Sequence, residues 1–179
     1  MPVPSDDADW GRAGAGDEAQ AAADELDQSR LTHLLGYASS RASITMRRVF
    51  LKHLGPLDLK VVEYSILVLV ASNPQVNQRQ LGETLDISAP NMAVTLDRLV
   101  ERGWVERVRG TRDRRAMHIH LTPSGHDLVR RAEKIAQTME NHTLRVLSPA
   151  EKALLIELLM KVATGKSGSG AKTVQPAKP

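Results

Sequence analysis

An arginine-rich turn is the part of this 179-residue sequence whose residue types most plainly suit a chemical task. Five arginines lie within RVRGTRDRRAMHIH (residues 107–120), around a Gly-Thr pair that is typical of a hairpin turn. Guanidinium groups bond phosphate bidentately, and a narrow A·T-rich minor groove attracts an inserted arginine. We therefore interpret Arg109, Arg112 and Arg114 as contacts to a nucleic acid.

A single acidic residue interrupts this turn. Asp113 is expected to pair with Arg115 or a neighbouring arginine, and the pair would fix the shape of the tip. Because exposed ion pairs contribute only about 0–1 kcal/mol, we assign Asp113 and Arg115 a positioning role. A solvated charged loop that binds nothing is the alternative, since isolated runs of charge usually have no partner.

The distribution of charge favours a polyanionic partner for the central part of the chain. The formal net charge is only +3, but residues 1–27 hold eight acidic residues and one basic residue. Residues 164–179 add three lysines, which leaves an excess of seven positive charges on residues 28–163. Their composition predicts a disordered acidic tail over residues 1–27 and a flexible basic tail over residues 164–179.

The elements that must position the arginines are predicted to be mostly helical. Apolar residues at helical spacing predict a first helix over Leu31–His53, which Gly55 and Pro56 end. Asp58 is expected to cap a second helix that runs to about Ser72.

Two short helices follow, and a tight turn at Asp86-Ile87 joins them. Asn77 and Gln80 have the spacing of a capping box at the start of the first helix. Ser88 is expected to cap the second helix, and Gly103 to end it. One face of the second helix is expected to pack on the body of the protein through Met92, Thr95, Leu96 and Leu99. This arrangement predicts a helix-turn-helix.

The opposite face of the second helix carries candidate contacts to bases and phosphates, namely Ser88, Ala89, Pro90, Asn91, Val94 and Arg98. Asparagine can bond adenine bidentately, and alanine and valine can contact thymine methyl groups. Ser88 and the amides of the first helical turn suit a phosphate. The alternative is an ordinary capped surface helix, although a solvated face seldom needs an exposed valine.

The first turn of the preceding helix offers Gln78, Arg79 and Gln80 as further contacts to the nucleic acid, or simply as a polar first turn. Beyond Gly103, residues 104–109 and 117–121 have the alternation of two strands, and the resulting hairpin is a wing.

Two more helices are predicted near the C-terminus. The first covers Pro123–Leu147 and has the spacing of a coiled-coil seam at Leu128, Ala132, Ile135, Met139, His142 and Val146. The second begins with Ser148 as N-cap, Pro149 at N1 and Glu151 at N3, and carries a thick apolar face. Both apolar surfaces need a partner.

The run LDRLVERGWVERVRGTRDRRAMHIHLTPSG resembles the wing and flanks of the MarR family of winged helix-turn-helix regulators. The matching features are Asp97-Arg98-Leu99, Gly103 with Val105, Asp113-Arg114-Arg115, and Leu121-Thr122 with Gly125. Ala93-Val94 departs from the polar Thr-Arg pair of many members, so operator preference cannot be transferred. A weaker similarity points to a subgroup that senses aromatic acids, including hydroxylated nicotinate.

The resemblance implies a mostly α (α+β) fold, with helical dimerisation elements over about 28–54 and 123–163 and a DNA-binding lobe over about 57–122. It implies a homodimer on an inverted-repeat duplex, which acts as a repressor that a small aromatic or phenolic acid releases. His33, Tyr37 and Arg41, at spacing i, i+4 and i+8, are candidate effector contacts together with Tyr64.

Other functions find little support in the sequence. The chain has no cysteine, no nucleophile motif and no phosphate-binding loop, so we expect neither an enzyme nor a cofactor. His118 and His120 could bind a metal, but no further ligand completes the set, so a metal-responsive regulator stays an alternative only. An architectural DNA-binding protein is the other alternative. The acidic N-terminus and the short apolar runs favour a cytoplasmic protein without a membrane span.

Overall fold

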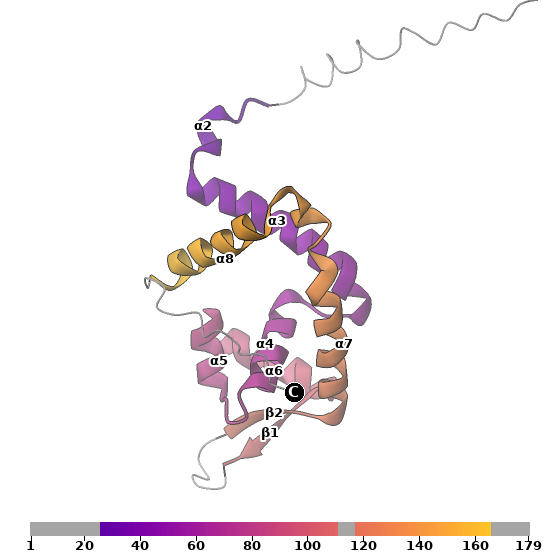
Figure 1. Cartoon of the computed structure of the whole chain (residues 1–179). Helices are drawn as coiled ribbons and strands as arrows, with labels where there is room; N and C mark the ends of the chain where they lie inside the picture. The colour runs from indigo at the N-terminus through magenta and orange to yellow at the C-terminus, as the bar shows by residue number, and fades with distance from the viewer. Residues whose placement is uncertain (1–25, 111–116, 166–179) are drawn as a thin grey trace, which may run out of the picture. The chain divides into compact units, whose positions relative to one another are not determined.

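The computed structural model describes residues 26–110 and 117–165, so residues 1–25, 111–116 and 166–179 lie outside it. The chain divides into two compact units, Met1–Ile44 and Thr45–Pro179. Helices dominate the described residues, and a two-stranded antiparallel sheet completes the fold (Figure 1). The predicted mostly helical class with a winged helix-turn-helix is thereby confirmed.

The first predicted helix is in fact two helices. α2 covers Ser29–Thr32, His33 is its C-cap, and α3 covers Leu35–Leu54. Thr32 and His33 are weak helix formers and Gly36 is weaker still, which explains a break that an apolar stripe cannot reveal.

The start of α4 also differs from the prediction. A 3-10 turn over Gly55–Leu57 ends at Asp58, which has the left-handed conformation (φ 53°) and does not cap α4. α4 covers Val61–Ser72, and Glu63 at its N3 position accepts a hydrogen bond from the backbone N–H of Lys60 at 3.0 Å. The capping carboxylate therefore comes from within the first turn.

The predicted helix-turn-helix is confirmed as α5 (Gln78–Leu85) and α6 (Ala89–Glu101), with Asp86 in the left-handed conformation between them. β1 (Val105–Arg109) and β2 (Met117–Leu121) pair antiparallel with Val105 opposite Leu121. The segment before α5 extends this sheet, because Ile119 N donates to Val76 O at 2.9 Å. The hairpin is thus anchored to the entrance of the helix-turn-helix.

The core of the second unit collects apolar side chains from α4, α5, α6, the hairpin and α7. Ile66, Leu67, Met92, Leu96 and Leu99 have no exposed surface. The predicted inner face of α6 is therefore confirmed.

The long helix predicted over Pro123–Leu147 is shorter in the structure. α7 covers Pro123–Met139, a 3-10 turn covers Thr143–Val146, and α8 covers Pro149–Thr164. Leu128 and Ala132 are buried, and Ile135 and Met139 pack on the same core. The interpretation of this spacing as a seam between chains is therefore wrong, because its first four positions complete the core of their own chain.

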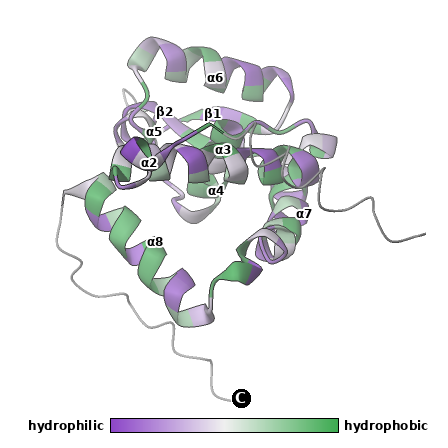
Figure 2. Ribbon diagram, turned by 90° about the horizontal axis from the view of Figure 1, so that it is seen from above, coloured by the Kyte–Doolittle hydropathy of each residue, from purple (hydrophilic) through white to green (hydrophobic). Residues whose placement is uncertain are grey.

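α8 begins as the sequence predicts. Ser148 and Glu151 form the capping box, with Glu151 Oε2 accepting from Ser148 N at 2.8 Å. This hydrogen bond lowers the pKa of the Glu151 carboxyl group. The apolar side chains of α8 stay exposed, from 41% at Leu159 to 65% at Val162. Figure 2 shows hydrophobic residues, in green, along much of this helix.

Candidate nucleic-acid interface

Local hydrogen bonds build the start of α5. Gln80 N donates to Asn77 Oδ1 at 2.9 Å, and Asn77 N donates to Gln80 Oε1 at 3.0 Å. This predicted capping box is confirmed, and it occupies the side-chain oxygen of Gln80. The amide N–H groups of Gln80 are therefore its main remaining donors to a nucleic acid.

The outer face of α6 presents the side chains that the sequence singled out. Ala89, Pro90, Asn91 and Val94 are exposed, and Val94 has 61% of its surface open to solvent. Ser88 occupies the N-cap position, but its side chain makes no cap hydrogen bond within the described residues. Ser88 and the first-turn amides of Ala89 and Asn91 lie at the same end of the helix, an arrangement that suits an anion.

Arg98 lies at the border between that outer face and the core of the protein. Its Nη1 donates to Glu63 Oε1 at 2.9 Å, and the Glu63 side chain is completely buried. The Arg98 side chain is still 39% exposed, so its contact with DNA stays a prediction, although its guanidinium group also neutralises a buried carboxylate.

The first turn of α5 offers one exposed cation. Arg79 has 84% of its side chain exposed, and its Nε lies 3.2 Å from Glu83 Oε1. Such a solvated pair is weak and can exchange for a phosphate. Gln78 is half-buried beside it.

The hairpin carries its arginines outward from the sheet. Arg109 is exposed at the end of β1, opposite Met117. Arg107 bonds Asp97 of α6, with Nη1 2.7 Å from Oδ1. The predicted contacts Arg112 and Arg114, and the predicted positioning pair Asp113 and Arg115, lie outside the described residues.

The candidate effector residues are not aligned as the sequence predicted. His33 lies in the break between α2 and α3, so it does not continue the helical face of Tyr37 and Arg41. Tyr37 is half-buried, and its hydroxyl group donates to the Gln28 side chain.

Tyr64 lies in the other unit, on α4. Its ring packs against Phe50 with a centroid distance of 5.9 Å. Burial raises the pKa of the Tyr64 hydroxyl group, and the negative charge of Glu133 raises this pKa further. Tyr64 is therefore a neutral phenol, able to donate a hydrogen bond, throughout the physiological range.

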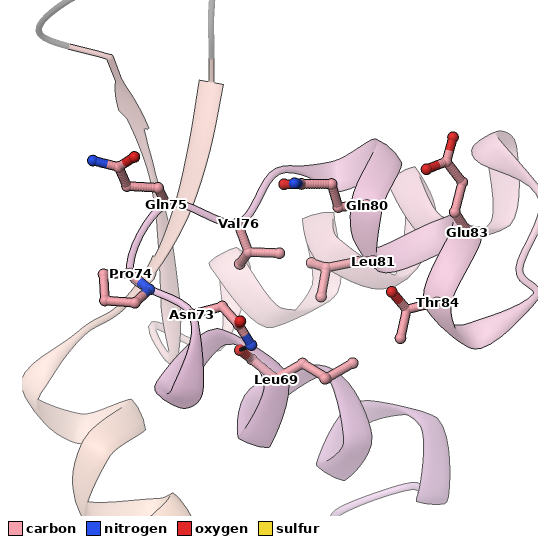
Figure 3. Close-up of a pocket in the computed structure, with 9 residues that line it drawn as sticks. All are labelled: Leu69, Asn73, Pro74, Gln75, Val76, Gln80, Leu81, Glu83 and Thr84. Carbon is pink, nitrogen blue, oxygen red and sulfur yellow. Dashed lines mark hydrogen bonds between the residues drawn. The ribbon is translucent and has the colours of Figure 1, made fainter. Parts of the chain in front are cut away.

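A pocket of about 810 Å³ lies between the end of α4, the segment that follows it, and α5 (Figure 3). Leu69, Val76 and Leu81 form its apolar part. Glu83 is the one charged residue in its lining, so the pocket offers no counter-ion to an acid. It contains none of the candidate effector residues.

A backbone carbonyl group fixes one histidine of β2. His118 Nδ1 lies 2.8 Å from the carbonyl oxygen of Gln75 and must therefore donate to it. Among the residues that the structure describes, no group of three His, Asp or Glu side chains could hold a metal ion.

Comparisons with known proteins agree with this geometry. A family model described as the MarR family matches residues 57–116, which contain the helix-turn-helix and the first strand of the wing. The multiple antibiotic resistance protein MarR of Escherichia coli (strain K12) is 28% identical over 116 residues, covering 64% of this chain and 81% of that protein. The transcriptional repressor CouR, solved bound to a 23-mer DNA duplex, is 34% identical over 78% of this chain and 99% of that chain, with a TM-score of 0.73.

The chain belongs to the MarR family. CouR has also been solved bound to p-coumaroyl-CoA, and that structure is 32% identical with a TM-score of 0.70, covering 78% of this chain and 98% of that one. CouR is a transcriptional repressor, and this chain is a transcriptional regulator of the MarR family. Within the described residues, no helix has the length and apolar character needed to span a membrane.

Sequence reasoning missed the polar residues that hold this MarR-family interface together. Glu63, Asp58 and Asp97 take arginine partners from α6 and from the wing. Glu63 carried one signal in the sequence, a charged residue within the apolar run of α4. A charge in such a position is rarely buried unless it is paired.

Proposed function

We propose that this protein is a homodimeric repressor that binds an inverted-repeat operator in the cytoplasm and is released by a small aromatic effector. The observation that carries the proposal is the division of α6 into two faces. Met92, Leu96 and Leu99 are fully buried, whereas Asn91 and Val94 are exposed near the helix N-terminus. A recognition helix enters the major groove with this end.

The proposed dimer rests on α8. Seven large apolar side chains of this helix are at least 41% exposed, which is unusual for a protein that acts alone. A two-fold dimer would present two copies of α6 about 34–36 Å apart, the spacing of successive major grooves on one side of a duplex. An inverted-repeat operator follows from that symmetry.

Footprinting on a genomic duplex library tests the DNA-binding part of the proposal. A regulator should protect discrete palindromic sites at moderate salt. Uniform protection that only weakens as salt rises would indicate the architectural alternative, because such binding depends on phosphate neutralisation alone.

Asn91→Ala is expected to relax base preference at one position of each half-site. The exposed amide can bond one adenine at two points, and losing that pair costs about 1–3 kcal/mol of discrimination. Binding to a set of duplexes that differ at single positions measures the effect. Val100→Ala, at the far end of α6, is the control that should keep the parent preference. An unchanged specificity profile for Asn91→Ala would remove this residue from base readout.

The proposed effector is an aromatic acid or its acyl thioester. The CouR structure bound to p-coumaroyl-CoA supports an aromatic acyl group. Tyr37, Arg41 and Tyr64 supply the hydroxyl and guanidinium groups that such a ligand needs.

Thermal-shift screening should distinguish the two chemical forms of the effector. Benzoate- and cinnamate-type acids form one arm, and their coenzyme A thioesters form the other. The effector should raise the melting temperature and release DNA, because it must favour a state that binds the operator less well. If every ligand that stabilises the protein leaves DNA binding unchanged, the proposed release mechanism is wrong.

A further inference from the structure

Two consecutive residues of α6 form ion pairs with two different elements of the fold. Asp97 bonds Arg107 of β1 at 2.7 Å, and Arg98 bonds Glu63 of α4 at 2.9 Å. Successive residues of an α-helix point about 100° apart, so these two ties hold the helix from different sides. Together they oppose rotation of α6 about its own axis.

The tie to Glu63 is the better fixed of the two. Glu63 is the one buried charged side chain among the residues that the structure describes, and its second oxygen accepts from Lys60 N at 3.0 Å. Both partners of the other pair are exposed, Arg107 to 32% and Asp97 to 58%, whereas in the pair with Glu63 only Arg98 is exposed, to 39%; salt therefore screens the attraction between Arg107 and Asp97 more strongly. Glu63 is therefore the fixed point against which the rotation of α6 is set.

Arg102 extends this tie to the C-terminal end of α6. It donates to the carbonyl oxygen of Asp58 at 2.8 Å and to its Oδ2 at 2.5 Å. Its guanidinium group also lies 3.7 Å from the centre of the Trp104 ring, and its Nη1 is 3.9 Å from Glu63 Oε2. Both oxygens of Glu63 therefore face an arginine of α6.

A buried ion pair is a poor way to gain stability, because well-packed apolar side chains often stabilise a core equally well. What such a pair supplies is direction, since a carboxylate and a guanidinium group bond only in a narrow range of geometries. A turn of α6 about its axis would break the bond of Arg98 with Glu63 and would move Asn91 and Val94 by the same angle.

We propose that Glu63 is a positioning residue of the DNA interface, which holds the rotation of α6 through Arg98 and so aims Asn91 and Val94 at the base edges. This inference rests on the proposed DNA-binding function. Glu63, which does not itself enter the DNA groove, would then contribute to the preference of the protein for one base sequence over another.

The test compares Glu63→Gln with the parent on two probes, a duplex selected by the parent from a random pool and an unselected duplex of equal length. Glutamine keeps the size and an acceptor oxygen but removes the charge that orients Arg98. The affinity for the selected duplex should fall about tenfold, and the affinity for the unselected duplex should stay within twofold. Ile66→Val, a buried substitution on the same helix, is the control for a purely structural effect.

A double-mutant cycle with Arg98→Gln separates positioning from stability. If Glu63 acts through Arg98, the double variant should lose no more discrimination than either single variant, because the same bond is broken in each. Circular dichroism first establishes the temperature range in which every variant is folded. If Glu63→Gln does not fold, Arg98→Lys, which keeps the charge but not the planar group, is measured in its place.

The outcomes separate this inference from the proposed function. If the parent selects no sequence from the pool, the proposed function fails and this inference fails with it. If the parent selects a sequence and Glu63→Gln discriminates as well as Ile66→Val does, only the positioning role of Glu63 is overturned. Additive losses in the cycle would also overturn it, because the two residues would then act independently.

Discussion

Gly125→Ala is expected to destabilise the protein by about 3 kcal/mol and to lower its melting temperature by roughly 6–12 °C. A Cβ atom at Gly125 would lie 2.0 Å from the carbonyl oxygen of Trp104, so one of the two backbone segments must move. The oxygen is held in place, because it accepts from Thr122 N at 3.1 Å. Thermal unfolding followed by circular dichroism measures the change.

Gly36→Ala is the matched control for this substitution. Gly36 is also helical, but an added Cβ there would meet nothing within 4 Å. Alanine should therefore be neutral or should stabilise the protein by up to about 1 kcal/mol. Equal melting temperatures for Gly125→Ala and the parent would show that the junction of the wing and α7 adapts without cost.

The junction at Gly125 gives the structural reason for the Leu-Thr-x-x-Gly pattern, which the sequence showed only as a family resemblance. Thr122 was expected only as part of a Leu-Thr-x-x-Gly match, and its hydroxyl group in fact donates to Gly103 O at 2.6 Å. Ser124 donates to the same oxygen at 2.6 Å. The end of α6 and the start of α7 are thus bonded together, and Gly125 permits the close approach. Spacing in the sequence cannot show which distant backbone a glycine must admit.

Helix starts that depend on neighbouring residues were predictable. The capping boxes at Asn77 and Ser148 involve partners three residues away, so the sequence contains everything that forms them. Asp58 does not cap α4, because the carboxylate of Glu63 has that role and Asp58 instead forms an ion pair with Arg102. Arg102 is 44 residues further along the chain, a separation that helical periodicity does not describe.

The same limit explains why the sequence did not reveal the partner of Arg98. Its place on the helix predicted exposure, and its side chain is 39% exposed, but its guanidinium group also bonds Glu63, which is 35 residues away. A long side chain on the border between two faces is directed by its partner, and only the tertiary structure identifies that partner. Asn91 and Val94 lie further from the core face, where periodicity alone decides, and both are exposed as predicted.

Periodicity also cannot tell a partner within the chain from a partner outside it. The apolar spacing of α7 predicted a second chain, but the core of the same chain covers Leu128 and Ala132. α8 gives the opposite result. Its leucines are exposed in a single chain. Only the burial of side chains in the structure distinguishes α7, which packs on its own core, from α8, which stays exposed. α8 is therefore the surface that we assign to the proposed dimer.

Replacing Leu155 and Leu159 of α8 with glutamate should therefore convert the protein to a monomer and lower its affinity for an inverted-repeat duplex at least 100-fold. The two leucines lie one helical turn apart and are 42% and 41% exposed in the single chain. Glutamate retains helix propensity, so α8 itself should persist, while charges facing each other across a dimer would repel. Simultaneous binding of two half-sites raises affinity by about 10²–10⁴, and a monomer loses that gain.

Sedimentation velocity and gel-shift titration measure the two effects on the same samples. Glu157→Gln on the same helix is the control, because it changes an exposed residue paired with Lys161 and should leave the dimer intact. A double variant that stays dimeric would place the dimer contact elsewhere than α8. The variant could also become monomeric and still bind the full inverted repeat as tightly as the parent. DNA affinity would then not depend on dimerisation, and the spacing of paired recognition helices would no longer account for the operator symmetry.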